Sequence, residues 1–317
     1  AVCMMAGTAS LPHVMMRYFT TPSVKAARRS VGWSLFFIFL LYSSAPMLAT
    51  LSKLSLMDPN LPTGIIGKSI ADVQAIDWYQ NWNQANLMFV SDFNGNGTLE
   101  LNEFFMGGKA VVLATPEVAG LPYVISGLVA AGGMAAAMST ADGLVLAISN
   151  ALSHDIYYKM INPKAETAKR LIVARVLLVI IGFAGATIAA LEIQGILGSV
   201  IWAFDFAMSG LFFPLVLGVW WKRANAQGAV AGMLLGLISG SAYLIWVRNG
   251  GAGFWGVTQL TFGIVGSLVS LVSMIVVSLI TKAPDSATQK MVDEVRVPSG
   301  KTVPVSYTHL TLPTSRS

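Results

Sequence analysis

The stretch Phe262–Ile280, FGIVGSLVSLVSMIVVSLI, contains no charged residue and is long enough to cross a bilayer as an α-helix. A second run, Leu121–Leu152, exceeds one span, so we expect it to be tilted or to continue past the bilayer. Together with the remaining runs, these stretches predict an all-α, polytopic membrane protein. The other apolar runs of spanning length are Gly32–Leu56, Ala168–Leu191, Ile196–Trp221 and Gly228–Val247.

The composition is typical of a chain whose apolar surface faces lipid or other apolar helices. Of the 317 residues, 55% are hydrophobic and 11% are charged, and the mean hydropathy is +0.66. A soluble domain carries about 25% charged residues. The net charge of +5 comes from basic residues spread over short loops, which indicates membrane topology and argues against a nucleic-acid partner. The single cysteine, Cys3, excludes an internal disulfide and a cysteine-based metal cluster.

Basic residues orient the spans. If the six runs alternate, most Lys and Arg outside them fall on one side, which we therefore place in the cytoplasm of a bacterial inner membrane. This predicts a cytoplasmic loop over 1–31 that follows a missing helix, a span over 32–56, an extracytoplasmic loop over 57–120, five spans over 121–282 and a cytoplasmic tail over 283–304. Residues 305–317, VSYTHLTLPTSRS, are unrelated in character and are taken as non-native.

The extracytoplasmic loop contains DFNGNGTLELNE at Asp92–Glu103, which fits the EF-hand-like calcium pattern D-x-[DN]-x-[DN]-G-x5-E. Calcium is a hard cation that takes six to eight oxygen ligands. Only three of the candidate ligands are carboxylates, so we expect weak affinity, about 0.1–1 mM, and a structural role. The alternative is a Gly/Asn-rich turn beside a helix start. The candidate ligands are Asp92, Asn94, Asn96, Thr98 through its carbonyl, Glu100 and Glu103.

The second run contains a segment of small residues over 130–143, which lets helix backbones approach closely in lipid. Within it, Ala136, Ser139 and Thr140 have i, i+3, i+4 spacing and share one helix face. The Ala136 carbonyl and the two hydroxyls can converge on one sodium ion. From spacing alone, helix packing with the hydroxyls bonded back to i−4 carbonyls is the favoured interpretation.

Two motifs favour the sodium site over helix packing alone. Met138-Ser139-Thr140, with SNALSHDIY at Ser149–Tyr157, resembles the eighth core helix of the sodium:solute symporter family. Leu11-Pro12-His13, followed by Met16–Phe19, resembles the cytoplasmic motif after core helix six of that family. Over roughly 7–282 the chain is similar to the acetate- or monocarboxylate-type branch, in which such a calcium-like loop also occurs.

The resemblance implies a LeuT-like inverted-repeat transporter fold, of which this chain would hold the second part: core helices seven to ten and two further spans. It also implies that Ala136, Ser139 and Thr140 supply part of a sodium site. Core helix one, outside this sequence, would supply the rest. The coupling ion is then Na+, and the transported solute is a small carboxylate.

Two carboxylates lie inside predicted spans, where they are functional candidates because burying them in a bilayer is costly. Asp142 follows Thr140 in the cytoplasmic direction and either lines an ion path or is held by neighbouring polar groups. Asp205 precedes a Ser-Gly pair and Pro214, a sequence that can bend a helix. A gating or hinge role competes there with a packed polar contact.

These observations favour a sodium-coupled symporter that imports acetate or another monocarboxylate. The alternative is a symporter-like membrane sensor domain of a signalling protein. A membrane enzyme is disfavoured, because His13, His154 and His309 are scattered and do not form a catalytic constellation. The sequence makes no prediction about the oligomeric state.

Overall fold

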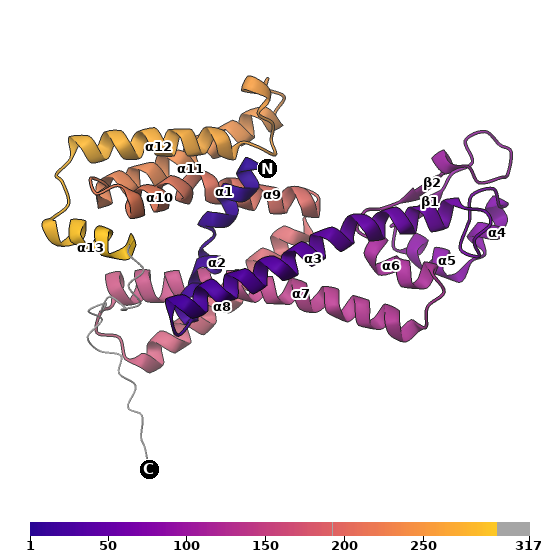
Figure 1. Cartoon of the computed structure of the whole chain (residues 1–317), viewed down its shortest axis with the longest axis horizontal. Helices are drawn as coiled ribbons and strands as arrows, with labels where there is room; N and C mark the ends of the chain where they lie inside the picture. Colours follow the sequence, from indigo (N-terminus) through magenta and orange to yellow (C-terminus); the bar gives the residue numbers. More distant parts are fainter. Residues whose placement is uncertain (192, 297–317) are drawn as a thin grey trace, which may run out of the picture. The chain divides into compact units, whose positions relative to one another are not determined.

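The structure is a computed structural model that describes residues 1–191 and 193–296. Within those residues, six helical segments are long and apolar enough to cross a membrane (Figure 1). The predicted all-α polytopic architecture is therefore confirmed. The predicted non-native stretch 305–317 and the end of the predicted tail lie outside the described residues. The six segments are Val24–Met57, Tyr123–Ile161, Thr167–Ala190, Ile196–Trp220, Ala226–Arg248 and Gly263–Ile280.

Two segments are longer than the apolar runs that predict them. The first, α3 (Val24–Met57), begins before Gly32 and includes the basic residues at its amino end. The second consists of α7 (Tyr123–Asn150), continued without a break by a π-helical stretch, η3 (Ala151–Ile161). Helical hydrogen bonding satisfies the backbone whether or not the side chains are apolar, so a helix can extend beyond its hydrophobic run.

The chain forms two compact units, which are described separately. One comprises Ser30–Gly143, and the other combines Ala1–Arg29 with the described residues from Leu144 onward. Between α3 and α7, the first unit contains α4 (Ile70–Gln74), α5 (Asp77–Gln84), β1 (Met88–Val90), η2 (Leu101–Glu103), β2 (Phe104–Met106) and α6 (Val111–Val118).

The predicted extracytoplasmic loop is a folded structure with its own hydrophobic core. Trp82 borders this core and donates a hydrogen bond from its indole to Glu117 at 2.9 Å, and Asn83 donates to the Met88 carbonyl at 2.8 Å. Each fully buried apolar side chain contributes about 1.5–3 kcal/mol. The buried residues of the core are Leu56, Ile65, Val73, Tyr79, Met88, Leu99, Ala110, Ala114 and Val118.

The second unit is dominated by a close pair of helices. Figure 1 shows α11 (Ala226–Arg248) running alongside α12 (Gly263–Ile280). Every fourth residue of α11 from Gly228 to Gly240 is a buried glycine facing this seam. At Gly236, an added Cβ would lie 2.1 Å from the Ser209 carbonyl oxygen and 2.7 Å from the Ser270 Cβ, so only glycine permits this approach.

The two helices are also joined at one end by a cap. Asn225 caps α11 by accepting from the Gly228 amide at 2.8 Å, and its Nδ2 donates to the Thr281 hydroxyl at 2.7 Å. One residue therefore ties the start of α11 to the end of α12. The other elements are α1 (Val2–Ser10), α2 (Pro12–Met16), η1 (Arg17–Thr20), α8 (Thr167–Ala190), α9 (Ile196–Ala207), η4 (Met208–Phe212), α10 (Phe213–Trp220), η5 (Phe254–Gly256) and α13 (Ser286–Arg296).

Candidate functional site

The three predicted sodium ligands lie on α7. Ala136, Ser139 and Thr140 are exposed in this structure, and the Thr140 hydroxyl donates to the Ala136 carbonyl oxygen at 3.3 Å. This is the back-bonding geometry that the spacing alone favours. The same contact places two oxygens close enough to touch one small cation. The structure thus brings Ala136 and Thr140 together, and Ser139 shares their face by its i, i+3 spacing from Ala136.

Asp142 is exposed on the same helix, two residues beyond Thr140. Side chains at i and i+2 of a helix do not face each other. Asp142 therefore points away from Thr140, but it lies three residues beyond Ser139 and is a neighbour of that hydroxyl on the helix surface.

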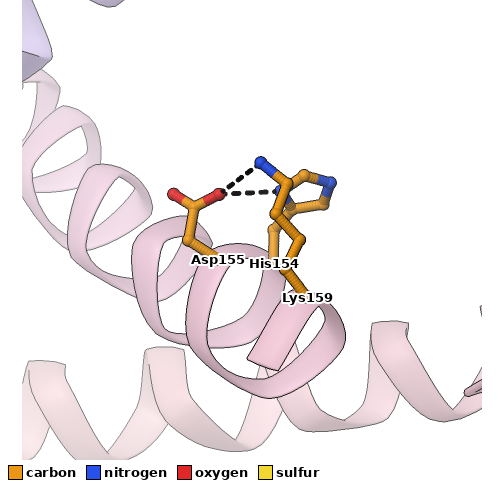
Figure 2. Close-up of polar contacts among 3 residues, drawn as sticks. All are labelled: His154, Asp155 and Lys159. Atoms are coloured by element: carbon orange, nitrogen blue, oxygen red, sulfur yellow. Dashed lines mark hydrogen bonds and ion pairs between the residues drawn. The ribbon is translucent and has the colours of Figure 1, made fainter. Parts of the chain in front are cut away.

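The π-helical end of this span carries a small polar cluster, which Figure 2 shows. One Asp155 carboxylate oxygen accepts from Lys159 Nζ at 3.1 Å and lies 3.1 Å from His154 Nδ1. All three side chains are exposed, so the ion pair contributes little. The hydroxyl of Ser149, just before this stretch, donates to the Ala174 carbonyl at 2.8 Å and joins it to α8.

The calcium-pattern loop Asp92–Glu103 lies between paired strands. β1 and β2 are antiparallel, with Met88 opposite Met106, and the short helical turn η2 ends the loop. The loop is therefore carried by a β-hairpin and not by the helix pair of an EF-hand. As in the alternative interpretation, it ends at a helix start, the 3-10 turn η2, which Glu100 and Glu103 cap reciprocally. A second segment also supports it, because the Leu99 amide donates to the Lys68 carbonyl and the Gly67 amide donates to the Leu99 carbonyl, both at 2.8 Å.

The side chains of the loop turn inward. Asp92 accepts from the Gly95 and Gly97 amides at 2.7 and 3.0 Å, and Gly97 has a φ of 68°, the left-handed region that glycine adopts readily. The amides of Asn94 and Asn96 donate to one Glu100 oxygen at 2.9 and 3.1 Å. These predicted ligands are thus brought together around a single carboxylate.

The last loop position, Glu103, is fully buried. Its two carboxylate oxygens accept from the Phe93 and Glu100 amides at 3.0 and 2.9 Å. Among the described residues, no Lys or Arg forms an ion pair with Asp92, Glu100 or Glu103. Each of the three carboxylates is held by hydrogen bonds within the loop, and the described residues contain no group of three acidic, histidine or cysteine side chains arranged to hold a metal ion.

Asp205 lies where α9 gives way to the π-helical turn η4. Its side chain is 0% exposed, and neither carboxylate oxygen has a hydrogen-bonding partner among the described residues. The Ser209 hydroxyl donates to the Asp205 main-chain carbonyl at 2.7 Å and not to the carboxylate. The Ser-Gly pair falls within this π-helical turn and Pro214 follows it, and such turns are frequent at functional sites.

The groups that enclose Asp205 were not predicted from sequence. The Cys3 thiol of α1 lies near the carboxyl group, and Gly263, the first residue of α12, lies against it. They come from positions far apart in the chain, and neither carries a motif. The only local signal was that a Ser-Gly pair and Pro214 follow Asp205, and that signal says nothing about which groups enclose the carboxylate.

Residues 108–236 match the model of the Sodium:solute symporter family. The chain is 40% identical over 304 residues to an uncharacterized symporter of Cupriavidus necator, covering 93% of this chain and 44% of that protein. It is 28% identical over 241 residues to a monocarboxylic acid transporter of Corynebacterium glutamicum, covering 75% of this chain and 36% of that protein. It is 29% identical over 167 residues to a sodium/proline symporter of Escherichia coli, covering 52% of this chain and 31% of that protein.

The chain therefore spans less than half the length of these curated relatives. It is a polytopic membrane protein that carries a sodium:solute symporter family domain. The matched range includes Ala136, Ser139, Thr140, Asp142 and Asp205, whereas the calcium-pattern loop lies before it.

Proposed function

We propose that this chain forms part of a sodium-coupled symporter that imports a small carboxylate, acetate or another monocarboxylate. The observation that carries the proposal is the family match across α7 to α11, the segment that holds the Ala136 face. The names of the relatives, symporters and transporters, favour transport over the sensor alternative. The monocarboxylic acid transporter supports the carboxylate, and the sodium/proline symporter makes proline the competing substrate.

In this proposal, the Ala136 carbonyl and the hydroxyls of Ser139 and Thr140 supply half of a sodium site. The 3.3 Å contact between Thr140 and Ala136 supports it, because rotation of the hydroxyl hydrogen away from the carbonyl lets both oxygens face one sodium ion. Further ligands would come from another helix whose carbonyls are free, as in transporters with broken helices. Asp142, next to Ser139 on the helix surface, would line the ion path.

The experiment is sodium-driven uptake by the transporter that carries this chain, reconstituted in proteoliposomes. We expect labelled acetate to accumulate under an inward sodium gradient and not under an equal potassium gradient. Accumulation of proline in place of acetate would assign the other substrate. Equal uptake of acetate under both gradients would refute sodium coupling.

The site is tested by removing its hydroxyls. A hydrogen bond or contact to a charged group contributes about 1.5–3 kcal/mol, so Ser139→Ala and Thr140→Ala should each raise the half-saturating sodium concentration about tenfold or more. Ser126→Ala is the matched control, because it removes a hydroxyl from the same helix about 20 Å away along the axis. An unchanged sodium dependence in both site variants would place the ion elsewhere.

We also propose that the loop Asp92–Glu103 binds calcium weakly and rigidifies the extracytoplasmic structure. Within the described residues Asp92, Glu100 and Glu103 form no ion pair, which supports this proposal because their negative charge is left for a cation to neutralise. Asn94 and Asn96, whose Nδ2 groups donate to Glu100 in this structure, would have to turn their Oδ1 atoms toward the ion. Thr98 would contribute its carbonyl oxygen. The loop would be a structural element of the transporter and not part of its coupling machinery.

A further inference from the structure

We propose that Asp205 is a buried proton-binding site whose protonation is linked to the docking of α1 on α9. This inference adds a proton to the proposed sodium coupling and does not depend on the substrate. It begins from a physical conflict: a carboxyl group within a span is 0% exposed, and its oxygens have no hydrogen-bonding partner in the described parts of the chain.

The energetics favour the neutral acid in the closed arrangement. An unpaired, fully enclosed carboxylate costs several kcal/mol even after relaxation of its surroundings. The amino end of α12 begins beside Asp205 at Gly263, and a helix amino terminus offsets at most about 2 kcal/mol of that cost. A bound proton removes the charge and therefore the remaining penalty.

Apart from the amino group of Ala1, the described surroundings of Asp205 supply no fixed counter-charge. Of the elements packed against α9, the π-helical turn and α12 carry no titratable side chain, and α1 carries only Cys3, next to the amino group of Ala1. On α11 the titratable groups are Tyr243 and Arg248. The Arg248 guanidinium lies over the Trp202 ring, 5.3 Å from its centroid, and donates a hydrogen bond to the Ile193 carbonyl at 3.3 Å.

The enclosure depends on α1. Cys3 and Ala6 of this helix are buried in a cluster with Met208 of the π-helical turn. At Gly7, an added Cβ would lie 2.5 Å from the Phe204 carbonyl oxygen, so the two backbones are in close contact. α1 ends at Ser10. Leu11, which follows it and precedes Pro12, has an extended backbone and forms a non-helical link between α1 and α2.

Docking and protonation are therefore linked. When α1 is docked, Asp205 holds its proton. When the acid O–H bond breaks and the proton passes to water, the anion favours an arrangement in which α1 has separated and water reaches the carboxylate. Each cycle of separation and docking releases and rebinds one proton at Asp205.

Cys3 is a built-in reporter, because it is buried beside Asp205 and is the single cysteine of these 317 residues. The experiment measures alkylation of Cys3 by a membrane-permeant maleimide as a function of pH, in the membrane-embedded transporter with any cysteine outside this chain replaced by serine. The reference for thiol ionisation is the double variant Cys3→Ser, Thr8→Cys, which places an exposed thiol on the same helix.

We expect Cys3 labelling, divided by that of the reference, to increase with pH by up to about tenfold per pH unit, the slope for one linked proton. Asp205→Asn, which mimics the protonated acid, should abolish the increase. Asp155→Asn, which removes an exposed carboxylate, should leave it intact. A ratio that is independent of pH, or that follows the sodium concentration at fixed pH, would overturn the proposal. Neither result depends on whether acetate is transported.

Discussion

Calcium binding by the loop Asp92–Glu103 can be tested by local amide exchange. The perturbation is a change from chelator to 10 mM calcium with the membrane-embedded chain otherwise unaltered. The loop amides of Gly97 and Glu100 donate to loop carboxylates, so they exchange only when the loop opens. Calcium that binds only the closed loop suppresses this opening by the factor 1 + [L]/Kd.

The magnitude follows from the ligand set. Three carboxylates with neutral oxygens correspond to a Kd of about 0.1–1 mM. At 10 mM calcium the closed loop then gains about 1.4–2.7 kcal/mol, and exchange of its amides slows by about 10- to 100-fold. The measurement is hydrogen–deuterium exchange of peptides that cover residues 88–106.

Variants separate metal binding from loop stability. Asp92→Asn removes a charge from the first ligand position and should abolish most of the calcium effect. Asp72→Asn removes an exposed carboxylate from α4 in the same unit and should leave the effect intact. Exchange rates that are equal with chelator and with calcium in the unaltered chain would refute the reasoning. An equal response to 10 mM magnesium would show general screening of charge and not a calcium site.

Two further predictions concern the packing that holds the second unit together. Gly236→Ala forces α11 away from the Ser209 carbonyl by roughly 1 Å and should lower the free energy of unfolding by about 1–3 kcal/mol, measured as a lower melting temperature in detergent. Gly218→Ala, which has open space at its Cβ, is the control. Equal melting temperatures of the two variants would contradict close packing of α11 against α12. Asn225→Ala removes the cap of α11 and its hydrogen bonds to the end of α12, and it should lower the free energy of unfolding by about 1–3 kcal/mol. Asn249→Ala, at the other end of α11, should lower it by less. A larger effect of Asn249→Ala would show that the cap is not the main contribution.

The sequence alone determined the membrane architecture. A charge-free stretch such as Phe262–Ile280 has few stable environments other than a bilayer core, and a helix is the structure that satisfies its backbone there. Spacing also determined which side chains share a face, because Ala136, Ser139 and Thr140 belong to one helix and helical geometry is fixed. The candidate calcium ligands of Asp92–Glu103 were also identified from the sequence, because a local pattern sets their spacing.

Tertiary structure decided what lies beside these residues. The pairing of the calcium-pattern loop with Gly67 and Lys68, and the core around Leu99, join segments that no local periodicity connects. Asp205 shows the same limit, because its sequence neighbours predict a bend and do not predict burial. Its enclosure arises from α1 and α12, at opposite ends of the chain, and only packing in three dimensions removes water from that carboxyl group. Burial depends on all the atoms around a group. The sequence therefore placed Asp205 in a span, and only the fold decided that its carboxyl group is buried.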